Sequence, residues 1–266
     1  MDGRNKKFIL ELQKKPKVRR ESGLYTVDGP KMAGELDPGD VENVYVTKSF
    51  LASQHFKECE ELLRSVRYEL VQDSEMKQMS DTVTPQGILV VARQKRVRGI
   101  RAMAEGVKDP LFLILETIQD PGNLGTIFRT AEAAGVTGII MNNETVDAWS
   151  PKVVRSTMGA VLRMPFTAVD DLNEAVTKLA SGAFTEGNKV NIYAAHLDGA
   201  VDYAAADLKG ASAIMIGNES RGLSDELSGR ADKKILIPMC GRTESLNAAV
   251  AAAVICFEAA RQRRIN

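Results

Sequence analysis

Three short segments of this 266-residue chain concentrate the polar side chains that could take part in chemistry. They read DPGNLGTIFRTAEAAG (120–135), IGNESRGLSDEL (216–227) and IPMCGRTESLNAAVA (237–251). Each begins near the end of an apolar run that is typical of a buried strand. Because ligands of open parallel sheets bind beyond the carboxyl ends of the strands, we expect a functional site in these three loops.

The residue types in the loops favour hydrogen bonding and charge stabilisation over metal or histidine chemistry. The chain has no H-E-x-x-H, G-x-S-x-G or G-x-G-x-x-G motif, and its only histidines are His55 and His196. A zinc protease, a serine hydrolase and a typical dinucleotide-binding enzyme are therefore disfavoured. We interpret both histidines as ordinary structural or surface residues, and we predict no metal site.

Taken singly, the candidate residues have ordinary structural explanations. Asn123 suits a turn, Arg129 suits a helix surface, and Ser245 suits the cap of the last helix. The sequence around Glu219 could form a plain turn. Their combination, in three loops that each follow an apolar strand, is what favours a functional site.

The elements that must position these loops follow an α/β pattern. Strands are expected at 111–118, 138–141, 191–197, 212–218 and 234–239, and helices at 124–135, at 150–162 and over the alanine-rich C-terminal segment. Near-continuous apolar strands between helices are typical of a parallel sheet covered on both faces. By itself, this pattern predicts a doubly wound sheet.

A smaller α/β unit precedes this sheet. Strands are expected at 23–29, 41–47, 68–73 and 87–93, with a helix at 51–66. The segment 93–110 is basic, contains turn-forming residues and ends at Pro110, which indicates a boundary. We therefore predict two domains, 1–104 and 107–266.

The chain is neutral overall, with 35 basic and 35 acidic residues, but the charge is unevenly distributed. Residues 1–20 carry eight Lys and Arg against two acids, and residues 93–101 carry five more. These basic segments suit contact with a polyanion, and they suit a solvated tail and linker equally well. Charge alone leaves both interpretations open.

Composition predicts a cytoplasmic protein without a membrane span. No apolar run reaches the length of a transmembrane helix, and the N-terminal MDGRNKKFIL lacks the core of a signal peptide. Three cysteines without a C-x-x-C pair fit reduced thiols better than a disulfide or zinc framework.

The three loops resemble the signature motifs of the SpoU (TrmH) family of RNA ribose 2′-O-methyltransferases, which belong to the SPOUT class. The first match pairs Asn123 with Arg129, the second centres on Glu219, and the third is the run Ser245, Leu246 and Asn247. The third motif is the most specific. The sequence departs from the usual family pattern at MCGRTE before the third motif and at NES in the second, which affects substrate detail more than family membership.

The N-terminal part resembles the same family's RNA substrate-binding domain, an α/β unit similar to ribosomal protein L30e. The matching segments are RRESGLYTVDGPK (19–31) and TPQGILVV (84–91). For the C-terminal domain the resemblance implies a parallel sheet with a trefoil knot, an exception to the rule that chains are unknotted. It also implies S-adenosylmethionine bound in the knot and a homodimer formed through the C-terminal domain, with the small residues of the last helix allowing close packing.

The resemblance further implies roles for individual residues. Gly217, Ile237 and Leu246 are expected to contact S-adenosylmethionine. Arg129 is the family's proposed agent, but a guanidinium cannot act as a base, so we expect it to hold the phosphate next to the target ribose and to stabilise the developing alkoxide. Glu219 would orient Arg129 or the hydroxyl. The remaining expected contacts are hydrogen bonds from Asn123, Ser245 and Asn247, and RNA contacts from Lys14, Lys15, Arg19 and Arg20.

Several alternatives stay open at this level. An RNA-binding module would explain the basic segments but not the three polar loops, and a dehydrogenase would need the missing glycine fingerprint. Within the enzyme class, the separate N-terminal domain favours 23S ribosomal RNA over transfer RNA as the substrate. The target nucleotide and the proton acceptor are not specified by the sequence.

Overall fold

Contacts within the chain divide the molecule into two compact units. The computed structural model describes residues 2–95, 99–198 and 201–264. One unit is Met1–Arg96 with Asp147–Leu162, and the other is Val97–Val146 with Arg163–Asn266. Residues 147–162, which the prediction assigns to the second domain, therefore pack with the first unit. Arg96 and Arg98 of the predicted basic segment lie outside the described residues.

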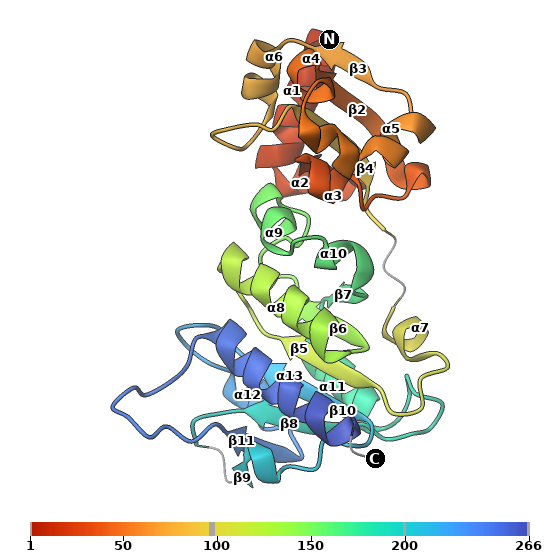
Figure 1. Ribbon diagram of the computed structural model, residues 1–266. Helices are drawn as coiled ribbons and strands as arrows, with labels where there is room; N and C mark the ends of the chain where they lie inside the picture. The colour runs from red at the N-terminus through yellow and green to blue at the C-terminus, as the bar shows by residue number, and fades with distance from the viewer. Residues whose placement is uncertain (1, 96–98, 199–200, 265–266) are drawn as a thin grey trace. The chain divides into compact units, whose positions relative to one another are not determined.

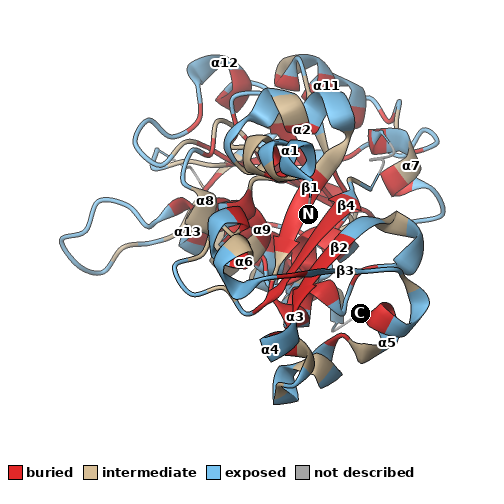
Figure 2. Ribbon diagram, turned by 90° about the horizontal axis from the view of Figure 1, so that it is seen from above, coloured by how far each residue is buried: buried red, intermediate tan, exposed pale blue. Residues whose placement is uncertain are grey.

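The first unit is built on a four-stranded sheet with strand order β1-β4-β2-β3. β4 pairs antiparallel with β1 and β2, whereas β2 and β3 are parallel. The strands are β1 (Leu24–Asp28), β2 (Val41–Thr47), β3 (Glu69–Val71) and β4 (Ile88–Arg93). Figure 2 shows the central strands as buried, and the edge strand β3 is only partly buried. All four strands lie within the ranges expected from the sequence.

The basic N-terminal segment is helical rather than an extended tail. α1 (Gly3–Lys14) and α2 (Pro16–Ser22) occupy it, and α1 buries Ile9 and Leu12 against the sheet. The interpretation of this segment as a solvated tail is therefore wrong. The other helices of residues 23–95 are α3 (Pro30–Ala33), α4 (Lys48–Leu51), α5 (Glu60–Ser65), α6 (Asp73–Met79) and the 3-10 helices η1 (Pro38–Asp40) and η2 (Gln54–Glu58).

The single helix expected at 51–66 is broken into α4, η2 and α5. Phe50 and Cys59 are both buried, whereas residues nine positions apart on a straight helix point to opposite sides of it. The helix expected at 150–162 is also interrupted, between α9 (Pro151–Ser156) and α10 (Ala160–Arg163). Gly159 has a φ of 90°, which lies outside the helical region and interrupts the helix. A Cβ at this position would lie 2.2 Å from a carboxylate oxygen of Glu35.

Several side-chain contacts attach residues 147–162 to the rest of the first unit. Asp147 accepts a hydrogen bond from Arg19 Nε at 2.7 Å, and the ring centroids of Trp149 and Tyr25 are 4.5 Å apart. In addition, Arg155 donates to Asp81 at 2.9 Å. These contacts join residues more than 70 positions apart, which sequence periodicity does not detect.

The second unit is built on a seven-stranded sheet with strand order β7-β6-β5-β10-β8-β11-β9, and each of its neighbouring pairs is parallel (Figure 1). Its strands are β5 (Leu111–Leu115), β6 (Gly138–Asn142), β7 (Phe166–Val169), β8 (Asn191–Ala195), β9 (Val201–Asp202), β10 (Ser212–Ile216) and β11 (Lys233–Leu236). The predicted α/β class with a parallel sheet is confirmed. β7 and β9 were not expected.

Helices cover both faces of this sheet. α7 (Ile100–Ala104), α11 (Leu172–Ala180) and α12 (Asp225–Ser228) pack with Phe112 and Ile114 in one core, and η3 (Tyr203–Ala205) follows β9. α8 (Pro121–Ala134) and α13 (Ala248–Arg264) pack side by side against β6 and β10 (Figure 1). Alternate residues of each strand point to opposite faces, so a fully apolar strand such as β5 serves both layers.

Candidate functional site

The first two loops meet because the strands that precede them are neighbours. β5 and β10 are parallel and in register, with Leu115 opposite Ile216, so both loops leave the same edge of the sheet. β5 continues into α8, whose N-terminus is capped by Asp120 accepting from the Asn123 N–H at 2.8 Å. The order in which the chain adds strands to the sheet reverses between β5 and β10. Ligands of such folds bind at the point where the strand order reverses.

A chain of side-chain hydrogen bonds joins all three motifs. Asn247 Nδ2 donates to Asn123 Oδ1 at 2.9 Å, and Asn123 Nδ2 donates to Glu219 Oε1 at 2.9 Å. The Glu219 carboxylate also accepts the backbone N–H groups of Gln119 and Asp120 at 3.3 and 3.2 Å. Residues separated by about 100 positions in the sequence are thus held within hydrogen-bond distance.

The surroundings of Glu219 keep its carboxylate ionised. Partial burial raises its pKa, but the hydrogen bonds from Asn123 and from the backbone N–H groups of Glu219, Asp120 and Gln119 outweigh burial and hold the pKa below its ordinary value of 4.5. A carboxylate stabilised in this way is a poor proton acceptor at neutral pH. Glu219 therefore orients Asn123 as a charged hydrogen-bond acceptor. The predicted role of Glu219, to orient Arg129 or the target hydroxyl, stays a prediction.

Asn247 has a second contact at the start of α13. Its Oδ1 accepts the backbone N–H groups of Ala249 and Val250 at 2.9 and 3.3 Å, as an N-cap does. Because one end of the amide caps the helix and the other end donates to Asn123, the orientation of Asn247 is set from both sides. Ser245, which the sequence suggests as the cap, does not perform this role in the structure.

A cavity of about 600 Å³ lies beside this hydrogen-bonded chain, within the second unit. Its wall includes Gly217, Ile237 and Leu246, the three residues predicted to contact the methyl donor, together with Ser245 and Glu219. That these three residues contact the donor stays a prediction. His196 also lines the cavity, and sequence reasoning did not distinguish it from an ordinary surface residue.

The cavity wall depends on a close approach of two backbone segments. A Cβ at Gly217 would lie 2.1 Å from the carbonyl carbon of Gly222 and 2.2 Å from the nitrogen of Leu223. Asn218 and Gly222 form an antiparallel bridge directly beside it. Only glycine allows this approach, so the conformation of the loop requires a glycine at position 217.

Arg129 does not take part in the hydrogen-bonded chain of Asn247, Asn123 and Glu219. It lies six residues after Asn123 on α8, roughly 9 Å along the helix axis, and its side chain is exposed. Among the residues that the structure describes, none forms a hydrogen bond or ion pair with it. The guanidinium is therefore accessible to a ligand, and its predicted role stays a prediction.

Among the predicted RNA contacts, Arg19 must be corrected. It is only 2% exposed, and its guanidinium donates to Asp147 and to the carbonyls of Leu12 and Gln13. A buried, fully engaged guanidinium cannot bind a phosphate at the surface. The neighbouring Lys14, Lys15 and Arg20 are exposed and stay predicted RNA contacts.

Sequence reasoning missed the residues that hold the second loop in place. Asn218 Nδ2 donates to the Thr117 carbonyl at 2.8 Å, at the start of this loop. At its end, the backbone N–H and the hydroxyl of Ser224 both donate to the Glu116 carboxylate at 2.7 Å. The only sequence signal was that Glu116 and Thr117 end an apolar strand.

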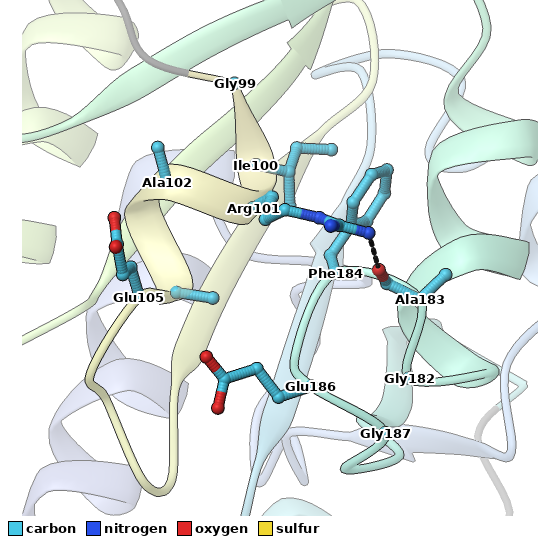
Figure 3. Close-up of a pocket in the computed structure, with 11 residues that line it drawn as sticks. Gly99, Ile100, Arg101, Ala102, Glu105, Gly182, Ala183, Phe184, Glu186 and Gly187 are labelled. Carbon is cyan, nitrogen blue, oxygen red and sulfur yellow. Dashed lines mark hydrogen bonds between the residues drawn. The ribbon is translucent and has the colours of Figure 1, made fainter.

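A second cavity of about 640 Å³ lies between α7 and residues 182–187, also within the second unit (Figure 3). Arg101 extends across it and donates to the Ala183 carbonyl at 2.9 Å. The predicted site residues are not part of its lining. It is therefore distinct from the cavity beside the three motifs.

Comparison with known proteins identifies the family of this chain. Residues 110–257 match the SpoU rRNA Methylase family, and residues 5–90 match the MRM3-like substrate binding domain. The chain is 28% identical over 91% of its length to the 23S rRNA (guanosine(2553)-2′-O)-methyltransferase RlmP of Bacillus subtilis, covering 90% of that protein. It is 29% identical over 96% of its length to human mitochondrial rRNA methyltransferase 3, covering 72% of that protein.

Solved structures give the same result. The SpoU methyltransferase AviRb from Streptomyces viridochromogenes, in complex with AdoMet, superimposes with a TM-score of 0.87, 26% identity and 99% coverage of both chains. An AdoMet-bound rRNA methyltransferase from Sinorhizobium meliloti superimposes with a TM-score of 0.82 and 30% identity, covering 97% of this chain and 95% of that one.

The family match and the named relatives define the class of protein, an RNA methyltransferase with an α/β fold. The chain belongs to the SpoU rRNA methylase family, whose model spans more than half of its length. The predicted family membership, and the predicted enzyme class with it, are confirmed.

The cavity fits S-adenosylmethionine, the cofactor of this family. Its volume of about 600 Å³ is in the range of small-molecule sites, and its wall combines apolar side chains such as Ile237 and Leu246 with backbone at Gly217. Within the described ranges, no group of three or more His, Cys, Asp or Glu side chains could hold a metal ion, and no helix is long and apolar enough to cross a membrane.

Proposed function

We propose that this protein transfers a methyl group from S-adenosylmethionine to a ribose 2′-hydroxyl of 23S ribosomal RNA. The observation that carries the proposal is the hydrogen-bonded chain Asn247–Asn123–Glu219, whose Glu219 lines the donor-sized cavity. Ribosomal RNA is favoured over transfer RNA because the relatives named above act on ribosomal RNA and because the N-terminal part matches a substrate-binding domain.

The bound donor supplies an electrophilic methyl group on a sulfonium, so the chain's own residues need only position the reactants and manage charge. Gly217, Ile237 and Leu246 hold the donor mainly through backbone and apolar contacts. Asn123, oriented by Glu219 and Asn247, offers the remaining hydrogen-bonding capacity of its amide to the ribose. Ser245 supplies a further hydroxyl at the cavity wall.

Arg129 acts on the RNA rather than on the donor. The sulfonium is positively charged, so a guanidinium has no favourable interaction with it. A guanidinium stays protonated at neutral pH and presents a planar pair of donors, which suits a phosphate and a developing alkoxide. Because Arg129 is exposed and about 9 Å along α8 from Asn123, its action requires the RNA or a second protomer to complete the site.

A homodimer through the C-terminal domain supplies that second protomer. Val250 and Phe257 on α13 are 47% and 46% exposed, and they are seven residues apart, which places them on one face of the helix. Exposed apolar side chains in a row on a helix favour an interface. The small residues between them allow a neighbouring helix to approach closely.

The remaining parts of the proposal concern the fold and the RNA contacts. We propose a trefoil knot in the C-terminal part, an L30e-like N-terminal part with domain limits at 104 and 107, and a cytoplasmic location. Lys14, Lys15 and Arg20 would contact RNA phosphates. The helical N-terminal segment supports this role because it directs its charged residues to the surface while it buries Ile9 and Leu12.

The experiment that tests this function maps 2′-O-methyl groups in total RNA from cells with and without the protein. Purified protein is then incubated with tritiated donor and with 23S ribosomal RNA or transfer RNA. Loss of one ribosomal 2′-O-methyl group, with label transferred only to ribosomal RNA, is the expected result. Label transferred only to transfer RNA, or the absence of any change in RNA, would overturn the proposal.

A further inference from the structure

Thr117 is one of three non-glycine residues with a positive φ among those described, and it is the one that lies beside the motif loops. Its φ is 57°, in the left-handed region that a β-branched residue adopts only at a cost. It follows β5 and precedes the loop that leads to Asn123. A strained residue at such a place persists only where its surroundings hold it.

Asn142, at the end of the neighbouring strand β6, provides this hold. Its Oδ1 accepts the Thr117 N–H at 2.8 Å, and its Nδ2 donates to Thr117 Oγ1 at 2.7 Å. The Thr145 hydroxyl donates to the same Oδ1 at 2.9 Å, which orients the amide. Thr117 is thus bound through both its backbone and its side chain to the end of β6.

The strained conformation directs the Thr117 carbonyl to the second motif. This carbonyl accepts from Asn218 Nδ2 at 2.8 Å, and Asn218 directly precedes Glu219. The strands β6, β5 and β10 are neighbours in the sheet (Figure 1). The hydrogen bonds that join Asn142 to Thr117 and Thr117 to Asn218 therefore connect the ends of three adjacent strands. This series of contacts ends beside the Glu219 carboxylate, which orients Asn123.

We propose that Thr117, held by Asn142, is a positioning residue for methyl transfer: it holds the Asn218–Glu219 segment in the geometry that orients Asn123. This inference rests on the proposed function for its effect on rate. The role of Thr117 includes no contact with the substrate or the donor. The other end of the loop has its own attachment, from Ser224 to Glu116, so weakening the hold of Asn142 on the Thr117 hydroxyl loosens the loop locally.

The test uses the full chain and three substitutions. Thr117→Gly removes the hydroxyl and also the strain, because glycine adopts this φ freely. Thr117→Ser keeps the hydroxyl. Glu186→Gly is the matched control, because Glu186 also has a positive φ, of 53°, but lines the second cavity (Figure 3). Comparing the two glycine variants separates relief of strain from loss of positioning.

Amide hydrogen exchange in segments 117–123 and 217–224 is the readout that does not depend on activity. We expect exchange there to rise about tenfold in Thr117→Gly, as local opening becomes easier, and to stay unchanged in Thr117→Ser and Glu186→Gly. With ribosomal RNA, kcat of Thr117→Gly should fall by about tenfold to a hundredfold, with KM for RNA and the thermal midpoint nearly unchanged. The serine variant should recover most of the rate.

Unchanged exchange in Thr117→Gly would overturn the inference, and so would a serine variant that behaves like the glycine variant. A wild-type protein that methylates no RNA would contradict the proposed function instead. The exchange comparison would still decide whether Thr117 holds the loop, so the two failures are distinguishable.

Discussion

The side-chain amide of Asn123 donates to Glu219 Oε1 at 2.9 Å, and this contact connects the first and second motifs. It determines which way the Asn123 amide points, because its carbonyl oxygen is left to accept from Asn247 at 2.9 Å. The site is thus organised by neutral amides around one ionised carboxylate. The predictions below test this organisation and the surfaces around it.

Glu219→Gln should lower methyl transfer by about a hundredfold. The amide of glutamine presents a donor where Asn123 and two backbone N–H groups also donate, so the Asn123 amide loses its orientation. Tritium transfer from labelled donor to ribosomal RNA measures the rate. Donor affinity, measured by calorimetry, is the control for an intact cavity. A variant with normal turnover would contradict the role of the carboxylate.

The lowered pKa of Glu219 also predicts a pH dependence of stability. The ionised carboxylate stabilises the fold above its unfolded pKa, near 4.5, and this contribution is lost as the pH falls through the lower folded value. The wild type should therefore lose stability on acidification below pH 4.5 more steeply than Glu219→Gln does. Thermal midpoints of both proteins across the acid range provide the measurement, and parallel curves would contradict the assignment.

Arg129→Ala should lower the rate of methyl transfer by about a hundredfold to a thousandfold without weakening donor binding. Arg129→Lys keeps the charge but loses the planar fork, so a residual rate would indicate charge stabilisation and complete loss would indicate bidentate positioning. Lys209→Ala, at an exposed cation away from the motif loops, serves as the control. Normal turnover in Arg129→Ala would exclude Arg129 from the mechanism.

Arg19 and Arg20 are adjacent but should behave in opposite ways. Arg19→Ala leaves Asp147 and two carbonyls without their donor, and we expect a loss of about 3 kcal/mol in the free energy of unfolding. Arg20→Ala should change stability by less than about 0.5 kcal/mol and should weaken RNA binding with a shallower salt dependence. Denaturant unfolding and RNA titration at several salt concentrations distinguish the two. Equal stability losses would contradict this assignment.

Gly217→Ala should disrupt the donor cavity, because the added methyl group would lie 2.1 Å from backbone of Gly222. We expect donor affinity to fall below detection by calorimetry. Gly210→Ala is the matched control, since a Cβ there meets nothing within 4 Å. Retained donor binding in Gly217→Ala would show that the two backbone segments can separate without loss of the site.

The proposed dimer is tested by replacing apolar residues on α13. Val250→Asp and Phe257→Asp place a charge on the exposed face of the helix, which should convert a dimer to a monomer. Light scattering at micromolar concentration gives the mass. Phe8→Asp, at an exposed aromatic residue of the first unit, should leave the mass unchanged. A wild-type monomer would contradict the dimer outright.

The sequence by itself determined the type of fold and the location of the site. β5 is a continuous apolar run and β10 is apolar except for Ser212, a composition that is typical of strands buried on both faces. The polar loops after them are local in sequence, so their motifs could be compared with a known family without any structure. The same reasoning did not predict the helices of the basic N-terminal segment, because the few apolar residues among the charges give only a weak helical periodicity.

Only the tertiary structure decided which residues work together. Asn123 and Asn247 are 124 positions apart, and their contact depends on the order of strands in the sheet, which periodicity does not encode. Arg19 lies in a run of cations that looks exposed, yet it is buried because Asp147 comes from a distant segment to pair with it. Thr117 has no sequence signal for a positive φ, because its conformation is imposed by Asn142 and Asn218 rather than by its own preference.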